Sequence, residues 1–277
     1  MLAEALLYAR ARLAGQHDHY GHLAEQVAIW ARHRRQRQAW AEHLTRARAL
    51  CLQAAEACTQ RRTALVLGAG VLLDVPLERL SALFERVVLA DMAFLPGTMR
   101  LAKRLGNVEL VTADLSGCLD TLPDAQALAA RTPAPTPNLS LGLPGLDFVH
   151  SANLLSQLPL HAVAALHKQG LGPPACEEDI EAFAASLVAA HLSALHALTC
   201  PASLVADTCE RTLADDETLH SEIDLLYGVP LPFQGKTWTW RLAPRGEISP
   251  SLHTQRLVLG APNIRAAATP PTGGPHA

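Results

Sequence analysis

The residues best suited to do chemistry in this sequence are glycines and acids that follow short apolar runs. Gly68, Ala69 and Gly70 stand directly after the run ALVL, and Asp91 ends the run VVLAD. A glycine turn lets a ligand approach the backbone closely, because no Cβ atom stands in the way. A carboxylate at the end of the following strand can accept hydrogen bonds from both hydroxyls of a ribose. The pattern favours a site for a nucleotide-like cofactor.

Polar residues also end three later apolar runs. Asp114 follows VELVTA, His150 and Asn153 stand in LDFVHSAN, and Asp207 ends SLVAD. The carboxyl ends of parallel strands meet at one edge of a sheet, so these side chains are expected near one crevice. His150, Asn153 and Asp207 are therefore candidate catalytic residues. The alternatives are a core-edge histidine for His150, and capping or a surface ion pair for Asp207 and the nearby Glu210.

Strands and helices alternate from residue 61 onward. Apolar runs predict strands at 64–68, 87–91, 108–114, 146–153, 203–207, 236–242 and 254–260. Helices are predicted at 76–86, 96–105 and 178–198, with a loop at 131–146. Short βα repeats imply a mostly parallel sheet with helices on both faces. The last two strands have no helix between them, so the predicted fold is a doubly wound α/β domain with a seven-stranded sheet and an antiparallel C-terminal hairpin.

The two ends of the chain differ from this α/β pattern. Residues 1–60 lack proline and are dense in helix-forming Ala, Leu, Arg and Gln, which predicts an N-terminal helical region. The domain proper is expected over 61–262, and the composition of 263–277 predicts a disordered tail. Six cysteines without a CxxC pair, and no apolar run of membrane-spanning length, favour a cytoplasmic protein that does not enter a membrane.

Two charged clusters lie in the N-terminal region. His17, His19 and His22 have the residue type of metal ligands, but a local cluster without a distant Cys, His or carboxylate partner is weak support for a metal site, and we expect none. The run RHRRQRQ at 32–38 could bind RNA phosphates. A solvated face, or a contact with the more acidic remainder of the chain, is the favoured alternative.

Taken together, the strand-end residues resemble those of the class I S-adenosylmethionine-dependent methyltransferases, a Rossmann-like family, over about 61–262. In that family a glycine turn follows the first strand, an acid ending the second holds the ribose, and a polar residue after the third touches the adenine. The fourth strand runs into N-x-L-x-x-L-P, which HSANLLSQLPL at 150–160 matches. The resemblance implies S-adenosylmethionine as cofactor, held by Gly68, Ala69, Gly70, Asp74, Asp91, Met92, Asp114, Leu115, Ser151 and Asn153.

The glycine turn departs from that family at two positions. Val66 stands where the family usually has an acid, and Leu72 where it often has a further glycine. We hypothesise that Asp74 replaces the missing acid and pairs with the ammonium group of the cofactor. The alternative is that Asp74 caps the helix that follows.

The resemblance leaves several alternatives open. A nicotinamide dehydrogenase would have a third glycine where Leu73 stands. Within the methyltransferase reading, a small-molecule acceptor with 1–60 as a substrate lid is favoured over an RNA acceptor docked on the arginine-rich helices. The altered turn also allows a non-catalytic cofactor-binding or interaction protein. Trp238 and Trp240 share one strand face, which is either an aromatic substrate wall or a buried sheet face. The acceptor atom and the oligomeric state are not fixed by the sequence.

Overall fold

The computed structural model describes residues 2–170 and 172–265 of the chain. The helices are α1 (Leu2–Leu13), α2 (His22–Arg35), α3 (Arg37–Glu56), α4 (Leu77–Leu83), α5 (Pro96–Leu105), α6 (Ala125–Ala129), α7 (Leu158–Gln169) and α8 (Glu177–Ala197), with short 3-10 turns η1 (His19–Gly21) and η2 (Leu119–Thr121). The strands are β1 (Thr63–Leu67), β2 (Arg86–Asp91), β3 (Val108–Thr112), β4 (Leu146–Ala152), β5 (Ala202–Ala214), β6 (Leu219–Asp224), β7 (Lys236–Ala243) and β8 (Leu252–Ala261).

All strands belong to one mixed sheet in the order β3-β2-β1-β4-β5-β8-β7, with β6 paired to β5 off this path. The first five strands are parallel. Strand β8 runs antiparallel to both β5 and β7. This confirms the predicted mostly parallel sheet with an antiparallel hairpin at one edge. The strand order reverses between β1 and β4, which is where open α/β sheets bind ligands.

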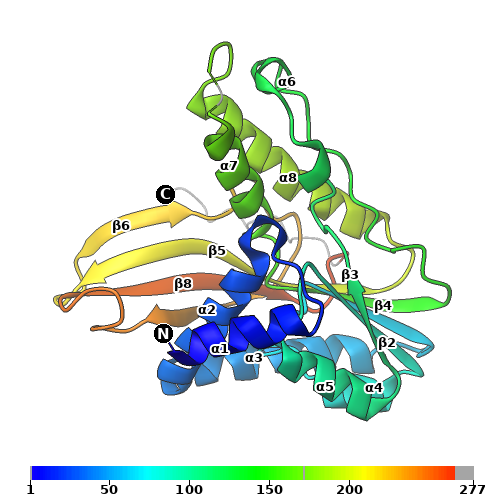
Figure 1. The fold of residues 1–277 in the computed structure, drawn as a ribbon. Coiled ribbons are helices and arrows are strands. Elements are labelled where there is room, and N and C mark those ends of the chain that lie inside the picture. The colour runs from blue at the N-terminus through cyan, green and yellow to red at the C-terminus, as the bar shows by residue number, and fades with distance from the viewer. Residues whose placement is uncertain (1, 171, 266–277) are drawn as a thin grey trace, which may run out of the picture.

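The number of strands is a correction, because the sheet has eight strands and not seven. Strand β5 continues far beyond the predicted 203–207 and forms an antiparallel ladder with β6. All six residues of β6 are exposed, and its sequence LHSEID has only two apolar residues, Leu219 and Ile223, which is too few for the apolar alternation from which strands are predicted. In Figure 1 this β5–β6 ribbon extends away from the helices.

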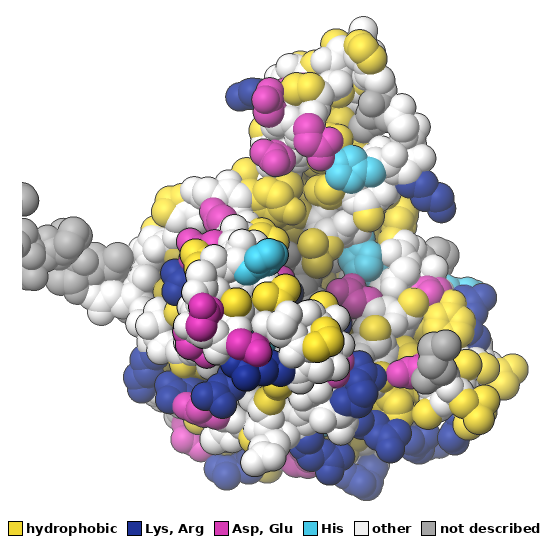
Figure 2. Space-filling view, turned by 90° about the vertical axis from the view of Figure 1, so that its left-hand side faces the viewer, with side chains coloured by type: hydrophobic (Ala, Val, Ile, Leu, Met, Phe, Trp, Pro, Cys, Tyr) yellow, Lys and Arg dark blue, Asp and Glu magenta, His cyan; other side chains and the backbone are white. Residues whose placement is uncertain are grey.

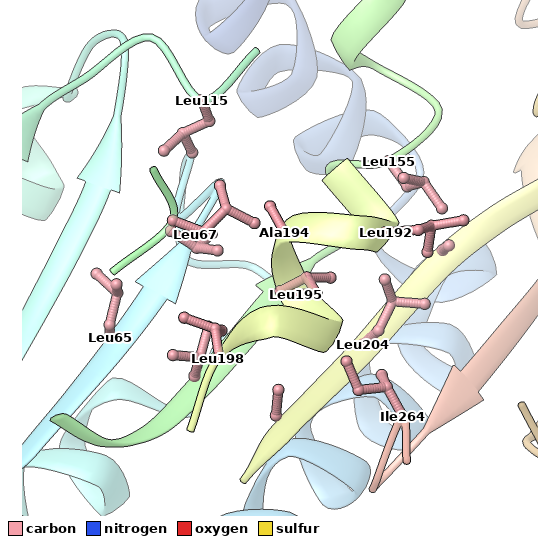
Figure 3. Packing of buried hydrophobic residues seen from close by; sticks show 14 of the residues in the cluster. Leu65, Leu67, Leu115, Leu155, Leu192, Ala194, Leu195, Leu198, Leu204 and Ile264 are labelled. Atoms are coloured by element: carbon pink, nitrogen blue, oxygen red, sulfur yellow. The ribbon is translucent and has the colours of Figure 1, made fainter. Parts of the chain in front are cut away.

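Helices cover both faces of the sheet, as a doubly wound fold requires. In Figure 1, α7 and α8 lie above the sheet, and α3, α4 and α5 lie below it. Leu192 and Leu195 of α8 pack against Leu65, Leu67 and Leu204 of the central strands, and all are buried (Figure 3). Helix α8 alone among the described residues is long and apolar enough to cross a membrane, by length and composition only. Its contacts with this core account for its apolar character.

The N-terminal region is helical, as predicted, and packs against the sheet. Helix α3 contacts β5, β7 and β8. The Trp40 indole on α3 donates a hydrogen bond to the carbonyl of Leu242 in β7 at 2.9 Å. The run at 32–38 contains the junction of α2 and α3, where Gln36 leaves helical geometry. The packed fold also runs beyond the predicted end at 262, since Ile264 is buried; the rest of the predicted tail, from 266, lies outside the described residues.

Candidate functional site

A cavity of about 220 Å³ lies at the carboxyl ends of β1 to β4. One wall is the glycine turn after β1, with Asp91 and Asp114 beside it. The opposite walls come from α2, α3 and α7 and from the C-terminal strands β7 and β8. Of the predicted cofactor residues, nine line this cavity: Gly68, Ala69, Gly70, Asp74, Asp91, Met92, Asp114, Leu115 and Asn153.

The conformation of the glycine turn explains its two glycines. Gly68 has a φ of +74°, and a Cβ atom there would lie 2.9 Å from Cβ of Leu154, so packing beneath the turn excludes a side chain. Gly70 has a φ of +49°, but a Cβ atom would meet its nearest neighbour only at 3.9 Å. Leu72 also has a left-handed backbone, with a φ of 59°. The turn therefore keeps, at Leu72, a conformation that glycine adopts most easily.

The side chains of Leu72 and Leu73 lie on different sides of the turn. Leu72 stands where the methyltransferases that the sequence resembles often have a glycine, and Leu73 stands where a nicotinamide dehydrogenase would have its third glycine. Leu72 packs on the core formed by α3, α4 and the sheet and does not line the cavity. Leu73 lines the cavity and packs beside Trp40 and Trp240. The two leucine side chains are therefore accommodated on opposite sides of the turn, Leu72 in the core and Leu73 in the cavity wall.

Asp91 connects the glycine turn, the sheet and the N-terminal region. Its Oδ2 accepts a hydrogen bond from the backbone N–H of Gly70 at 2.7 Å, and its Oδ1 accepts from the N–H of Met92 at 2.8 Å. The Gln26 amide of α2 donates to the same Oδ1 at 3.0 Å and to the carbonyl of Ala93 at 2.7 Å. Burial raises the pKa of Asp91 to about 6, although these hydrogen bonds favour the charged form.

Asp114 is held in a tight turn after β3. Its Oδ1 accepts hydrogen bonds from the N–H and the hydroxyl of Ser116, and its Oδ2 accepts from the N–H of Leu119 at 2.9 Å. Leu115, buried beside it, gives this part of the cavity an apolar surface. The turn presents one carboxylate and one aliphatic side chain to a ligand.

Asp74 lines the cavity and does not cap α4. That helix has Pro76 at its N-cap and no side-chain capping hydrogen bond, so the capping alternative is wrong. The pKa of Asp74 is raised to about 6, mainly by burial and also by the nearby carboxylate of Asp207, while the backbone hydrogen bond of Asp74 itself and the charge of Arg48 oppose the shift. A partly buried acid whose strongest charged neighbour is another acid gains most from a cationic ligand.

Asn153 and Asp207 form one network with Arg256. Asn153 has a φ of 47° and lines the cavity. Its amide donates to Oδ2 of Asp207 at 3.1 Å, and its Oδ1 accepts from the N–H of Asp207 at 2.9 Å. Arg256 binds Asp207 Oδ2 at 2.7 Å and Glu210 Oε2 at 2.8 Å. Asp207 is fully buried, so the structure makes it a positioning residue for Asn153 and Arg256 and not a group that meets substrate.

Two other predicted residues lie outside the cavity lining. His150 is 1% exposed within β4, and its Nδ1 lies 2.8 Å from the hydroxyl of Ser203. Ser151 is fully buried, with its hydroxyl 3.1 Å from Nε2 of His191. Both predictions are corrected for the same reason: residues inside a central strand are covered by the helices on each face, and in β1 to β4 only residues at or past the strand end reach the crevice.

An aromatic cluster forms the wall made by α3 and β7. The His43 ring stacks on Trp240 with centroids 4.1 Å apart, and Trp40 meets Trp240 edge-on at 4.8 Å. Trp238 donates its indole N–H to Nδ1 of His43 at 3.1 Å. Burial lowers the pKa of His43 to about 3, helped by Arg256, so the ring is neutral. Trp238 and Trp240 are both buried, as the sheet-face alternative expects, and Trp240 also lines the cavity.

Sequence reasoning missed the residues that the N-terminal helices and α7 place in the cavity. These are His22, Glu25, Gln26, Ile29, Arg32, Trp40, His43 and Leu44 from 1–60, Leu158, Leu160 and His161 of α7, and Gln157 directly before α7. Three polar atoms among them, Nε2 of His22, Oε1 of Gln26 and Nε of Arg32, are buried without a hydrogen-bond partner. The histidines of HDHYGH at 17–22 were a visible signal in the sequence, but only the fold shows that His22 lines the cavity.

Several of the solved structures similar to this chain are methyltransferases. A 1,6-didemethyltoxoflavin-N1-methyltransferase of Burkholderia thailandensis, bound to 1,6-didemethyltoxoflavin and S-adenosylhomocysteine, matches at 15% identity with a TM-score of 0.35, covering 85% of this chain and 86% of that one. The N-methyltransferase NodS of Bradyrhizobium japonicum, bound to S-adenosylhomocysteine, matches at 11% identity and 0.36, covering 82% and 89%. An rRNA methylase of Streptococcus thermophilus matches at 11% and 0.32, covering 77% and 94%.

No protein-family model and no curated protein matches the sequence. The three structural matches described above show a likeness of fold. Their identities and TM-scores are low, so the function has to be argued from the cavity of this chain.

Proposed function

We propose that this protein is a cytoplasmic S-adenosylmethionine-dependent methyltransferase that acts on a small-molecule acceptor. The main support for the proposal is that one cavity is lined by the glycine turn and by Asp74, Asp91, Asp114 and Asn153. This cavity lies where the strand order of the sheet reverses, between β1 and β4. These residues come from separate stretches of the chain. Their convergence is what a cofactor with an amino acid, a ribose and an adenine requires.

The residues of the cavity fit the three parts of that cofactor. Space above Gly70 allows a ligand to lie on the turn, because a Cβ atom there would still find no close neighbour. Asp91, fixed at the turn by Gly70, would accept hydrogen bonds from the ribose. Asp114 and Leu115 would border the adenine. Asp74 would accept hydrogen bonds from the ammonium group, and the positive charge of that group would offset the free-energy cost of keeping the Asp74 carboxylate charged in the cavity.

When bound, S-adenosylmethionine supplies an electrophilic methyl group. The protein then has to hold the acceptor in line with that group and exclude water. Trp240 and Leu242 offer an apolar wall for this purpose. Asn153, fixed by Asp207, would orient a polar atom of the acceptor. An amide is not a base, and His150 and Asp207 are sealed from the cavity, so none of the three predicted catalytic candidates would act as a general base.

A small acceptor is favoured by the way the N-terminal helices close the cavity. We propose that residues 1–60 act as a lid on the domain formed by 61–262, since Gln26 of α2 is tied to Asp91 at its centre. Two arginines of the run at 32–38 are occupied within the chain: Arg35 pairs with Glu247 at 2.6 Å, and Arg32 lies 3.8 Å from the same carboxylate. Figure 2 shows basic side chains along the lower side of the body with acidic ones among them.

Two measurements test this proposal. S-adenosylmethionine or S-adenosylhomocysteine should raise the melting temperature by mass action, while NAD should not. Labelled S-adenosylmethionine should then transfer its methyl group to a member of a small-molecule acceptor panel. Binding without transfer to any acceptor would favour a non-catalytic cofactor-binding protein. RNA binding that weakens steeply with salt would favour the nucleic-acid alternative.

A further inference from the structure

The cavity contains a cluster of potential metal ligands that methyl transfer as proposed above does not use. His22 and Glu25 lie three residues apart and so share one face of α2. His161 of α7 completes the cluster, and one ligand atom from each of the three residues lies within 4.8 Å of the other two. All three residues line the cavity and are half-buried.

The hydrogen bonds of His161 fix which ring nitrogen faces the cluster. Its Nδ1 lies 2.7 Å from the carbonyl of Tyr20, and a carbonyl only accepts, so Nδ1 carries a hydrogen. Nε2 lies 2.7 Å from Oε2 of Glu25. In a neutral ring this Nε2 is an acceptor, and the carboxylate is also an acceptor. Two acceptors at this separation require a proton or a metal ion between them.

His22 brings a second ring nitrogen to the same place. Its ring centroid lies 3.6 Å from that of His161. Its Nε2 is buried and has no hydrogen-bond partner. An unsatisfied buried ring nitrogen beside a histidine–carboxylate pair is a second observation that points to a ligand, since such groups are normally paired.

We propose that His22, Glu25 and His161 bind one divalent transition-metal ion of the Zn²⁺ type. Two imidazoles and one carboxylate are a donor set that such ions accept, with further positions left open. The hydrogen bond from His161 Nδ1 to a backbone carbonyl is the usual outer support of a metal-binding histidine. Bonds of about 2.0–2.2 Å to nitrogen and oxygen require the three side chains to close on the ion by small rotations.

The open positions of this ion would face the cavity. In a step that rests on the proposed function, a hydroxyl or carboxylate oxygen of the acceptor would occupy one of them and be oriented by it. The metal site itself stands on the three residues and does not depend on the cofactor.

The test is a titration of the full chain, treated first with a chelator, with Co²⁺ followed by its visible absorption. The wild-type chain should bind one equivalent and show the intense bands of a low-coordinate cobalt site. His161→Asn and His22→Asn should reduce binding at least tenfold. His167→Asn is the matched control, because His167 lies on the same helix and pairs with an exposed carboxylate, Glu177, at 2.9 Å. That variant should bind cobalt like wild type.

Circular dichroism of each variant verifies folding, and Glu25→Gln provides a near-isosteric variant should a histidine variant unfold. The proposal is overturned by a wild-type chain that takes up less than a tenth of an equivalent, or by equal uptake in the wild-type chain and the cluster variants. Either result would leave the cluster as a histidine–carboxylate ion pair. The melting shift with S-adenosylhomocysteine is measured on the same samples, so failure of the metal site and failure of the cofactor site are distinguishable.

Discussion

Replacing Asp74 by asparagine should stabilise the ligand-free protein and weaken its binding of S-adenosylhomocysteine. Burial raises the pKa of Asp74 to about 6, about two units above its ordinary value. Each unit corresponds to about 1.4 kcal/mol, so holding this carboxylate charged at pH 8 costs the folded state up to about 3 kcal/mol. Asparagine keeps the shape of the side chain and removes that cost.

The pH dependence follows from the same shift. Because the pKa is raised in the folded state, the stabilising contribution of Asp74 is complete below about pH 4 and is lost as the pH rises through about 6. The difference in melting temperature between Asp74→Asn and wild type should therefore be several degrees at pH 8 and shrink towards pH 5. Affinity of the wild-type chain should fall below pH 6, where Asp74 no longer offers a charge to the ammonium group.

Thermal denaturation and calorimetric titration at both pH values measure these effects. Glu78→Gln is the control, because Glu78 is an exposed carboxylate in the first turn of α4, close in sequence to Asp74. It should change neither quantity appreciably. An Asp74→Asn protein that is less stable at pH 8 and binds S-adenosylhomocysteine as wild type does would refute the reasoning, since it would make Asp74 a structural residue.

Three further predictions concern the turn, the lid and the buried network. Gly68→Ala should lower the free energy of unfolding by more than about 2 kcal/mol, because the backbone strain and the clash with Leu154 add together. Gly70→Ala should lower it by only about 1–2 kcal/mol, because only the backbone strain applies there. Urea denaturation of both variants measures these losses, and equal losses would contradict the prediction. Gln26→Ala should speed hydrogen exchange in α2 but not in β1, because it removes the hydrogen bond from Gln26 to Asp91. Unchanged exchange in α2 would show that this hydrogen bond does not hold α2 against the domain. Arg256→Gln should lower the free energy of unfolding by about 3–5 kcal/mol, because it leaves Asp207 charged and buried without its partner. Denaturant melts measure the loss, and a smaller loss would mean that Asp207 is neutral.

The central part of the fold could be predicted because its strands are apolar on both faces. Runs such as ALVL and VVLA are buried throughout, and their order with the intervening helices defines a parallel sheet. Strand β6 could not be predicted in this way, because its residues are all exposed. Its partner is the extension of β5 past Asp207, whose more polar sequence also lacks a buried-strand pattern.

The candidate site was predictable only where strand ends form it. Gly70, Asp91 and Asp114 follow directly from the rule that strand ends line the crevice. Residues brought by long-range packing carry no such local signal. His22 belongs to a histidine cluster with no visible partner in sequence, yet α7 supplies His161 beside it. A local spacing rule therefore finds the cofactor side of the cavity and misses the side made by the N-terminal helices.

The most direct test of the cofactor site is a crystal structure of the protein grown with S-adenosylhomocysteine. The ligand should lie over Gly68 and Gly70, with its ribose hydroxyls on Asp91 and its ammonium group within hydrogen-bonding distance of Asp74. A cavity that stays empty at saturating ligand, or a ligand whose amino group lies away from Asp74 and whose ribose does not touch Asp91, would contradict the proposed function at its foundation.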